Sequence, residues 1–119
     1  MKKMSNVLID STNGNMIITE ATTLQRDVII TSISCDRVTV RQDIKNDLYS
    51  ASWSKDIVLT KNTQRALLAG LDNYICDLSS VLYSAEDDEE EIDNLIPINK
   101  INVLLIESRR LYHTIELLL

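Results

Sequence analysis

The C-terminal stretch, residues 97–119, constrains the fold most. It reads PINKINVLLIESRRLYHTIELLL. Its apolar residues follow a near-heptad stripe, and a proline suits the first turn of a helix, so the stretch predicts one long helix. Val103–Ile106 is apolar almost all round, and such a helix must be covered on more than one side. A chain of 119 residues with a small sheet has little to cover it with. We therefore expect a homo-oligomer through the C-terminal helices.

A second helix is predicted from Thr60 or Asn62, either of which can cap it, to about Ser84. Its apolar positions recur with helical spacing: Leu67, Leu71, Ile75, Leu78 and Leu82. Gly70 lies inside this pattern, where glycine costs about 1 kcal/mol relative to alanine. Two interpretations remain open, a tolerated glycine or the close approach of another backbone.

An acidic run separates the two helices. Residues 86–93 read EDDEEEID and carry seven carboxylates. Because like charges repel and cannot pack, this run predicts a solvated loop. Residues 60–119 should then form an antiparallel hairpin of two helices with the acidic loop at 86–93. Weak cation binding and mimicry of nucleic acid are the alternatives for the run, which lacks the ligand spacing of a calcium loop.

The first half, residues 1–59, indicates β-structure. Val7–Asp10 and Met16–Glu20 are β-prone runs around Asn13-Gly14, a signal for a hairpin turn. Further strand candidates are Asp27–Ser34, Arg37–Gln42, Leu48–Trp53 and Ile57–Leu59, with Cys35-Asp36 and Asp43–Asp47 as turns. The prediction is an α+β fold in a single domain, residues 1–119. A small antiparallel sheet of four to six strands precedes the two-helix hairpin.

The composition narrows the classes of function. The net charge is −6, which disfavours binding of duplex nucleic acid through its phosphates. Two isolated cysteines, Cys35 and Cys76, indicate a reducing compartment. The start of the chain has no apolar region typical of a signal peptide, and no run is long enough to span a membrane. We expect a cytoplasmic protein without a membrane partner.

Arg109, Arg110 and His113 interrupt the apolar C-terminal helix. Their spacing of three and four residues allows them to lie on one side of it. Two guanidiniums on a rigid helix can bind phosphate or carboxylate bidentately. The alternative is a surface strip with helical ion pairs to Glu107 or Glu116.

Three further residues are candidates for a ligand site. Tyr83 and Asn94 flank the acidic run, where an aromatic ring can stack on a base and an amide can read its edge. Arg26 could reach the same region of a neighbouring subunit. No nucleophile elbow, Gly-rich phosphate loop or metal-ligand spacing is present in the sequence. We therefore expect no catalytic residues, no cofactor and no metal, and the chain is predicted not to be an enzyme.

This layout, a hairpin-rich N-terminal sheet followed by two helices around a polar loop, resembles the first-described phage anti-Thoeris proteins. The likeness is architectural and spans the whole chain. That family implies oligomeric sponges that sequester cyclic ADP-ribose-type signals without degrading them. It implies a pocket lined by Tyr83, Asn94, Arg109 or Arg110, and Arg26. Two departures stand out: the aromatic is tyrosine where the family has phenylalanine, and seven carboxylates lie beside a phosphate pocket.

The expected function is therefore sequestration of a small anionic nucleotide in a pocket between the subunits of a homo-oligomer. If the chain is phage-encoded, this would take place in the host bacterial cytoplasm. Two alternatives remain open. One is an inhibitor whose acidic run occupies a basic site on a nucleic-acid enzyme. The other is a structural subunit of a larger assembly.

Overall fold

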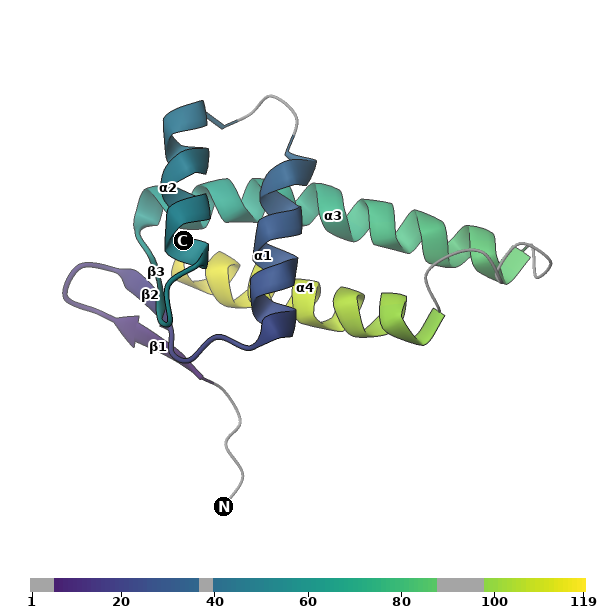
Figure 1. Cartoon of the computed structure of the whole chain (residues 1–119), viewed down its shortest axis with the longest axis horizontal. Helices are drawn as coiled ribbons and strands as arrows, with labels where there is room; N and C mark the ends of the chain where they lie inside the picture. Colours follow the sequence, from purple (N-terminus) through teal and green to yellow (C-terminus); the bar gives the residue numbers. More distant parts are fainter. Residues whose placement is uncertain (1–5, 37–39, 88–97) are drawn as a thin grey trace, which may run out of the picture.

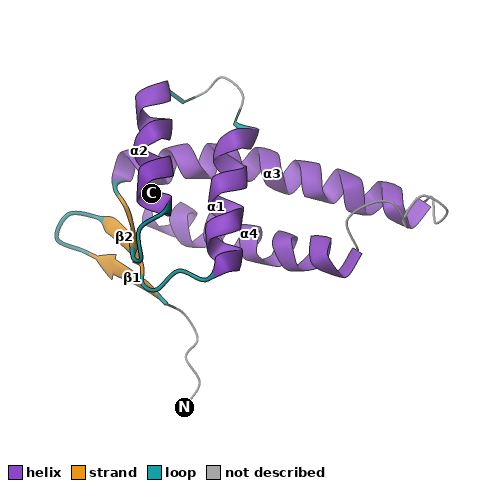
Figure 2. Ribbon diagram, viewed as in Figure 1, coloured by secondary structure: helices purple, strands orange, loops and turns teal. Residues whose placement is uncertain are grey.

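The computed structural model describes residues 6–36, 40–87 and 98–119. Within them the chain forms three strands and four helices in the order β1, β2, α1, α2, β3, α3, α4 (Figures 1 and 2). The fold is α+β, as predicted. The proportion of helix to strand differs from the prediction, because two of the predicted strands are helical. The part of residues 1–59 that the structure describes is therefore not β-rich.

The sheet has the antiparallel order β1-β2-β3, formed by Val7–Asp10, Asn15–Ile18 and Ile57–Leu59. The hairpin predicted at Asn13-Gly14 is present. Gly14 adopts φ +75°, and its N–H donates to the carbonyl of Asp10 at 2.8 Å. The buried face carries Met16, Ile18, Ile57 and Leu59, whereas Leu8, Ile17 and Val58 are aligned on the other face.

Helix α1 (Thr23–Cys35) replaces the strand predicted at Asp27–Ser34. Its start is fixed by a capping box. The Gln25 N–H donates to Thr22 Oγ1, and the Gln25 side chain accepts from the Thr22 N–H. The buried residues recur with helical spacing, at Gln25, Val28, Ile29, Ser32 and Ile33. The β-branched residues favoured a strand, but capping and burial of one face stabilise a helix.

Helix α2 (Gln42–Ser52) replaces both the turn predicted at Asp43–Asp47 and the strand predicted at Leu48–Trp53. Asp36, predicted to lie in a turn between two strands, caps the end of α1. Its buried carboxylate lies 3.3 Å from Lys45 Nζ on α2. The same ammonium donates to the Asp36 carbonyl. The ion pair thus ties α2 to the end of α1. Of the strand predicted at Arg37–Gln42, residues 37–39 lie outside the described residues, and Gln42 opens α2.

Helix α3 (Lys61–Asp87) is the central element, packing against α1, α2, β3 and α4. Thr60 caps it as predicted, accepting from the Thr63 N–H. A Cβ added to Gly70 would lie 2.1 Å from the carbonyl oxygen of Ser32. This distance settles the open question about Gly70 in favour of a close backbone approach, here by α1. The fully buried Gln64 donates to the carbonyls of Gly14 and Leu59, which joins the sheet to α3.

Helix α4 (Ile98–Leu118) lies beside α3 and runs in the opposite direction (Figure 1). Lys61 Nζ, at the start of α3, donates to the carbonyl of Leu118 at the end of α4. The acidic run is only partly visible: Glu86 and Asp87 belong to the last turn of α3, and residues 88–93 lie outside the described residues. The hairpin with its solvated loop therefore stays a prediction.

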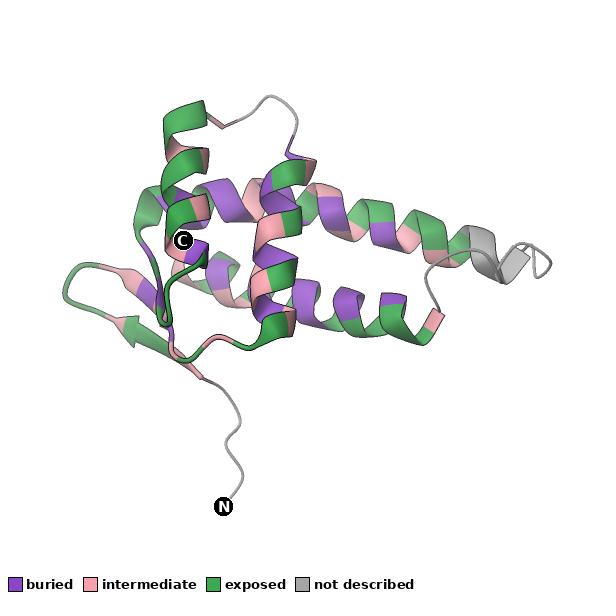
Figure 3. Cartoon of the chain, in the orientation of Figure 1, coloured by how far each residue is buried: buried purple, intermediate pink, exposed green. Residues whose placement is uncertain are grey.

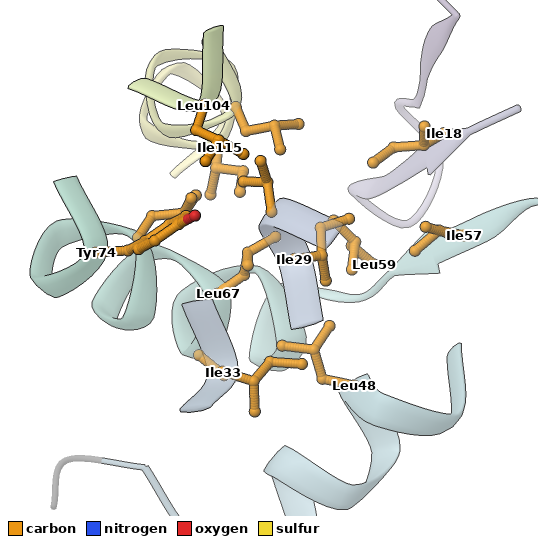
Figure 4. Packing of buried hydrophobic residues seen from close by; sticks show 14 of the residues in the cluster. Ile18, Ile29, Ile33, Leu48, Ile57, Leu59, Leu67, Tyr74, Leu104 and Ile115 are labelled. Atoms are coloured by element: carbon orange, nitrogen blue, oxygen red, sulfur yellow. The ribbon is translucent and has the colours of Figure 1, made fainter. Parts of the chain in front are cut away.

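The core lies where α1 crosses α3 and α4 beside the sheet. Ile18, Ile57 and Leu59 meet Ile29, Leu67 and Ile115 there (Figure 4). Exposed and half-buried residues together make up most of the part of α3 that extends beyond α1 (Figure 3). None of the helices in the described parts of the chain is long and apolar enough to cross a membrane.

Candidate functional site

A groove between α3 and α4 is the clearest candidate site. It has a volume of about 250 Å³ and is open to solvent. Six residues line it: Ser79, Leu82, Tyr83, Asn102, Leu105 and Arg109. Two apolar side chains thus lie among a phenol, a hydroxyl, an amide and a guanidinium. A few convergent polar groups around an apolar surface are typical of a small-molecule site.

Helical spacing brings these residues together. Ser79 and Tyr83 are one turn apart on α3, and Asn102, Leu105 and Arg109 follow one side of α4. The structure thus unites two of the six predicted ligand residues, Tyr83 and Arg109. Their partners Ser79 and Asn102 were not predicted. The spacing 102, 105 and 109 was available as a signal, but short polar residues on a helix are usually solvent-exposed without a role.

Arg110 and His113 do not line this groove. Arg110 Nη1 lies 3.5 Å from Glu107 Oε1, and His113 Nδ1 lies 3.7 Å from Glu116 Oε1. The helical contacts of the alternative interpretation are therefore present for these two residues, and the contact of His113 is an ion pair only when its imidazole is protonated. Glu107 is 6% exposed, and its Oε2 has no hydrogen-bond partner among the described residues. A buried carboxylate was not foreseen there, because its place in the sequence suggested a surface residue.

The remaining two predicted ligand residues lie elsewhere. Arg26 is in the first turn of α1, and its Nη2 donates to the Ser54 carbonyl at 3.1 Å. This bond ties α1 to the segment between α2 and β3, so Arg26 does not reach the groove of its own chain. Asn94 lies outside the described residues.

A second groove, of about 260 Å³, lies between the starts of α2 and α3. Val40, Arg41, Ile44, Asn62, Arg65 and Ala69 line it. Arg41 donates two hydrogen bonds to the carboxylate of Asp43, and these bonds hold the pKa of Asp43 below its usual value. With Arg41 engaged in this way, the second groove has less positive charge to offer a ligand.

Two tyrosines show how the α3 and α4 surfaces affect titratable groups. Burial raises the pKa of Tyr74, and the charges of Cys35 and Asp27 raise it further. The pKa of Tyr112 is raised by desolvation and then by the carboxylates of Asp72 and Glu116. Both phenols therefore stay neutral near pH 7. Among the described residues, no three His, Cys, Asp or Glu side chains are grouped to hold a metal ion.

Comparisons of the chain with protein-family models, curated proteins and solved structures each gave no match. Its function is therefore inferred from the groove and from the surfaces around it.

Proposed function

We propose that the protein is a non-catalytic, oligomeric binding protein that sequesters a small anionic nucleotide in the α3–α4 groove. The observation that carries this proposal is the meeting of Tyr83 and Arg109 in one open groove. The same proposal places the protein in the cytoplasm, where it would act as phage anti-defence sponges do.

The groove offers a chemical fit to each part of such a ligand. The guanidinium of Arg109 can donate two parallel hydrogen bonds to a phosphate. Tyr83 is 68% exposed as a residue, which leaves its ring available to stack on a base. Asn102 and Ser79 can donate to and accept from hydroxyls of a sugar or the edge of a base. The six lining residues include no His, Lys, Asp or Glu to act as a base on the hydroxyls of Ser79 and Tyr83. Because such hydroxyls are weak nucleophiles without a base, we expect the ligand to be bound without a reaction.

Two neighbouring arginines provide the test. Arg109→Ala removes the guanidinium of the groove, whereas Arg110→Ala removes one that pairs with Glu107. We expect Arg109→Ala to weaken binding of a cyclic ADP-ribose-type or cyclic nucleotide at least about tenfold, because a hydrogen bond to a charged group contributes about 1.5–3 kcal/mol. Arg110→Ala should bind within about twofold of the wild type.

Isothermal titration calorimetry with these nucleotides measures both variants, and uncharged adenosine serves as the ligand control. The same affinity for both variants, or no binding by the wild type, would contradict the proposal. Mass spectrometry of the ligand after release checks that it is intact, as a sponge requires.

A structural assembly subunit is the second candidate. Large apolar side chains outside the groove favour it: Leu8 is 57% exposed and Val58 42% on the outer face of the sheet, and Trp53 is 69% exposed. Exposed apolar surface of this kind is typical of protein contacts. This candidate predicts open-ended assembly, which sedimentation velocity would reveal as large or polydisperse particles.

A further inference from the structure

The solvent-facing side of α4 carries a regular stripe. Its members are separated alternately by four and three residues: Asn99, Val103, Ile106, Arg110, His113 and Leu117. All six are exposed, and Leu117 is 85% and Ile106 61% exposed. The alternation of four and three is the heptad spacing by which one helix packs along another. We call these six residues the outer stripe of α4.

The outer stripe is separate from the side of α4 that faces the core. Leu104, Ser108, Leu111 and Ile115 are buried against the rest of the fold, and they lie on the opposite side of the helix. The helix thus carries two packing faces, and one chain covers only the inner face. The isoleucine and leucine of the outer stripe leave apolar surface in water. Covering that surface would contribute a favourable free energy of about 25 cal/mol per Å².

We propose that the outer stripe binds the same stripe of a second copy of the chain, with the two α4 helices antiparallel across a two-fold axis. This inference rests on the oligomer of the proposed function and specifies its contact surface, and it does not depend on the proposed ligand. A two-fold contact requires a self-complementary surface, because each pairing between the copies occurs twice. The outer stripe meets this requirement in one register.

In that register Ile106 lies opposite Leu117 of the partner subunit, and Val103 lies near Leu119 of the partner subunit. The exposed large apolar side chains of residues 98–119 are then all covered. At the edge of the stripe, Arg109 lies opposite Glu116 of the partner subunit, so that two reciprocal ion pairs form when no phosphate occupies the groove.

The centre of this contact is polar. Arg110 lies opposite His113 of the partner subunit, and a neutral imidazole can accept from a guanidinium. Glu107 of the same chain already lies 3.5 Å from Arg110 and compensates its charge. Glu116 lies 3.7 Å from His113 in the same way. A polar layer inside an apolar seam lowers affinity but specifies register and orientation.

Other arrangements are less favourable. Moving the antiparallel pair by one heptad puts Ile106 opposite Arg110 and brings the two copies of Arg109 together. A parallel pair places every residue opposite itself, so Arg110 meets Arg110. Both bury a charge against an apolar or like-charged group, which opposes binding.

Disulfide trapping tests the register in a background of Cys35→Ser and Cys76→Ser. The variant with both Ile106→Cys and Leu117→Cys should form disulfide-linked dimers under mild oxidation. Each single variant is the matched control and should remain unlinked, since two copies of either position lie about 16 Å apart in this register. Linkage of a single variant, or a wild-type chain that sediments as a monomer at every concentration, would overturn the proposal.

An exchange of charges between positions 109 and 116 tests the ion pairs. It also distinguishes the dimer proposal from the proposal of nucleotide binding. Arg109→Glu and Glu116→Arg should each raise the dimer dissociation constant at least about fivefold, and the double variant should restore it to within about twofold. If the double variant does not restore the dimer, the register is wrong. Nucleotide binding should stay lost in the double variant, because a carboxylate would then replace the guanidinium of the groove. A restored dimer whose nucleotide binding is unchanged would refute the ligand proposal alone.

Discussion

At the scale of single residues, Gly70 determines how closely α1 can approach α3. A Cβ at this position would lie 2.1 Å from Ser32 O and 2.7 Å from Ser32 C, both of which are backbone atoms. A backbone cannot move aside as the end of a flexible side chain can. The two helices would have to separate, and the buried contacts of Ile29 and Ile33 would loosen with them.

We predict that Gly70→Ala lowers the free energy of unfolding by about 1–3 kcal/mol, as overpacking of a core does. The sign is diagnostic, because the same change in an unobstructed helix interior would raise stability by about 1 kcal/mol. Denaturation in urea, followed by circular dichroism, measures it. The control is Gly14→Ala, which acts through the positive φ of a turn and through the flexible side chain of Lys61, and which leaves the contact between α1 and α3 intact. Stabilisation by Gly70→Ala would argue against the close approach.

At the scale of elements, the start of α1 joins the helix to the sheet. The side chains of Gln25 and Asn6 exchange two hydrogen bonds, of 2.9 and 2.8 Å, and Asn6 Nδ2 also donates to the Thr19 carbonyl. Gln25 therefore belongs both to the capping box with Thr22 and to a link with the residue before β1. One side chain positions the helix relative to the hairpin.

We predict that Gln25→Ala lowers the free energy of unfolding by about 1.5–3 kcal/mol, because it removes a cap and both part-buried hydrogen bonds to Asn6. Thr22→Ala should cost only about 1 kcal/mol, since it removes the cap and leaves the link to Asn6. Urea denaturation of both variants measures which substitution lowers the free energy of unfolding more. Equal losses would mean that the link to Asn6 adds no stability.

The same elements show what the sequence can predict. The two long helices and the first hairpin could be predicted, because helical spacing and Asn13-Gly14 are local signals. Helix α1 could not be predicted from its β-branched residues, and its capping box Thr22-x-x-Gln25 was the local signal that predicts a helix. For the site, the sequence indicated Tyr83 and Arg109. It could not separate Arg109 from Arg110, because their neighbours depend on how α4 is turned against α3.

At the scale of the whole molecule, the core and the groove occupy different parts of α3. The first half of α3 packs against α1, α2 and the sheet, and Ala66, Leu67 and Leu71 are buried there. Beyond Leu78 the residues up to Tyr83 are exposed or half-buried, and Ser79, Leu82 and Tyr83 line the groove together with α4. The groove thus lies where the fold has fewer buried contacts, and such regions open locally at low free energy.

We predict that amides of residues 64–74 exchange with deuterium most slowly and those of residues 79–83 at least about tenfold faster, because fewer buried side chains oppose local opening beyond Leu78.

A bound nucleotide should slow exchange at residues 79–83 and 102–109 and leave residues 64–74 unchanged, since a ligand stabilises the closed form that binds it. Raising the protein concentration without ligand should instead protect the amides of α4 around Ile106 and Leu117. Hydrogen exchange read by mass spectrometry follows both effects in one experiment. Arg109→Ala is the control for the ligand, and Leu117→Asp is the control for the dimer. Protection by the nucleotide confined to residues 64–74 would place the ligand in the core region and refute the groove.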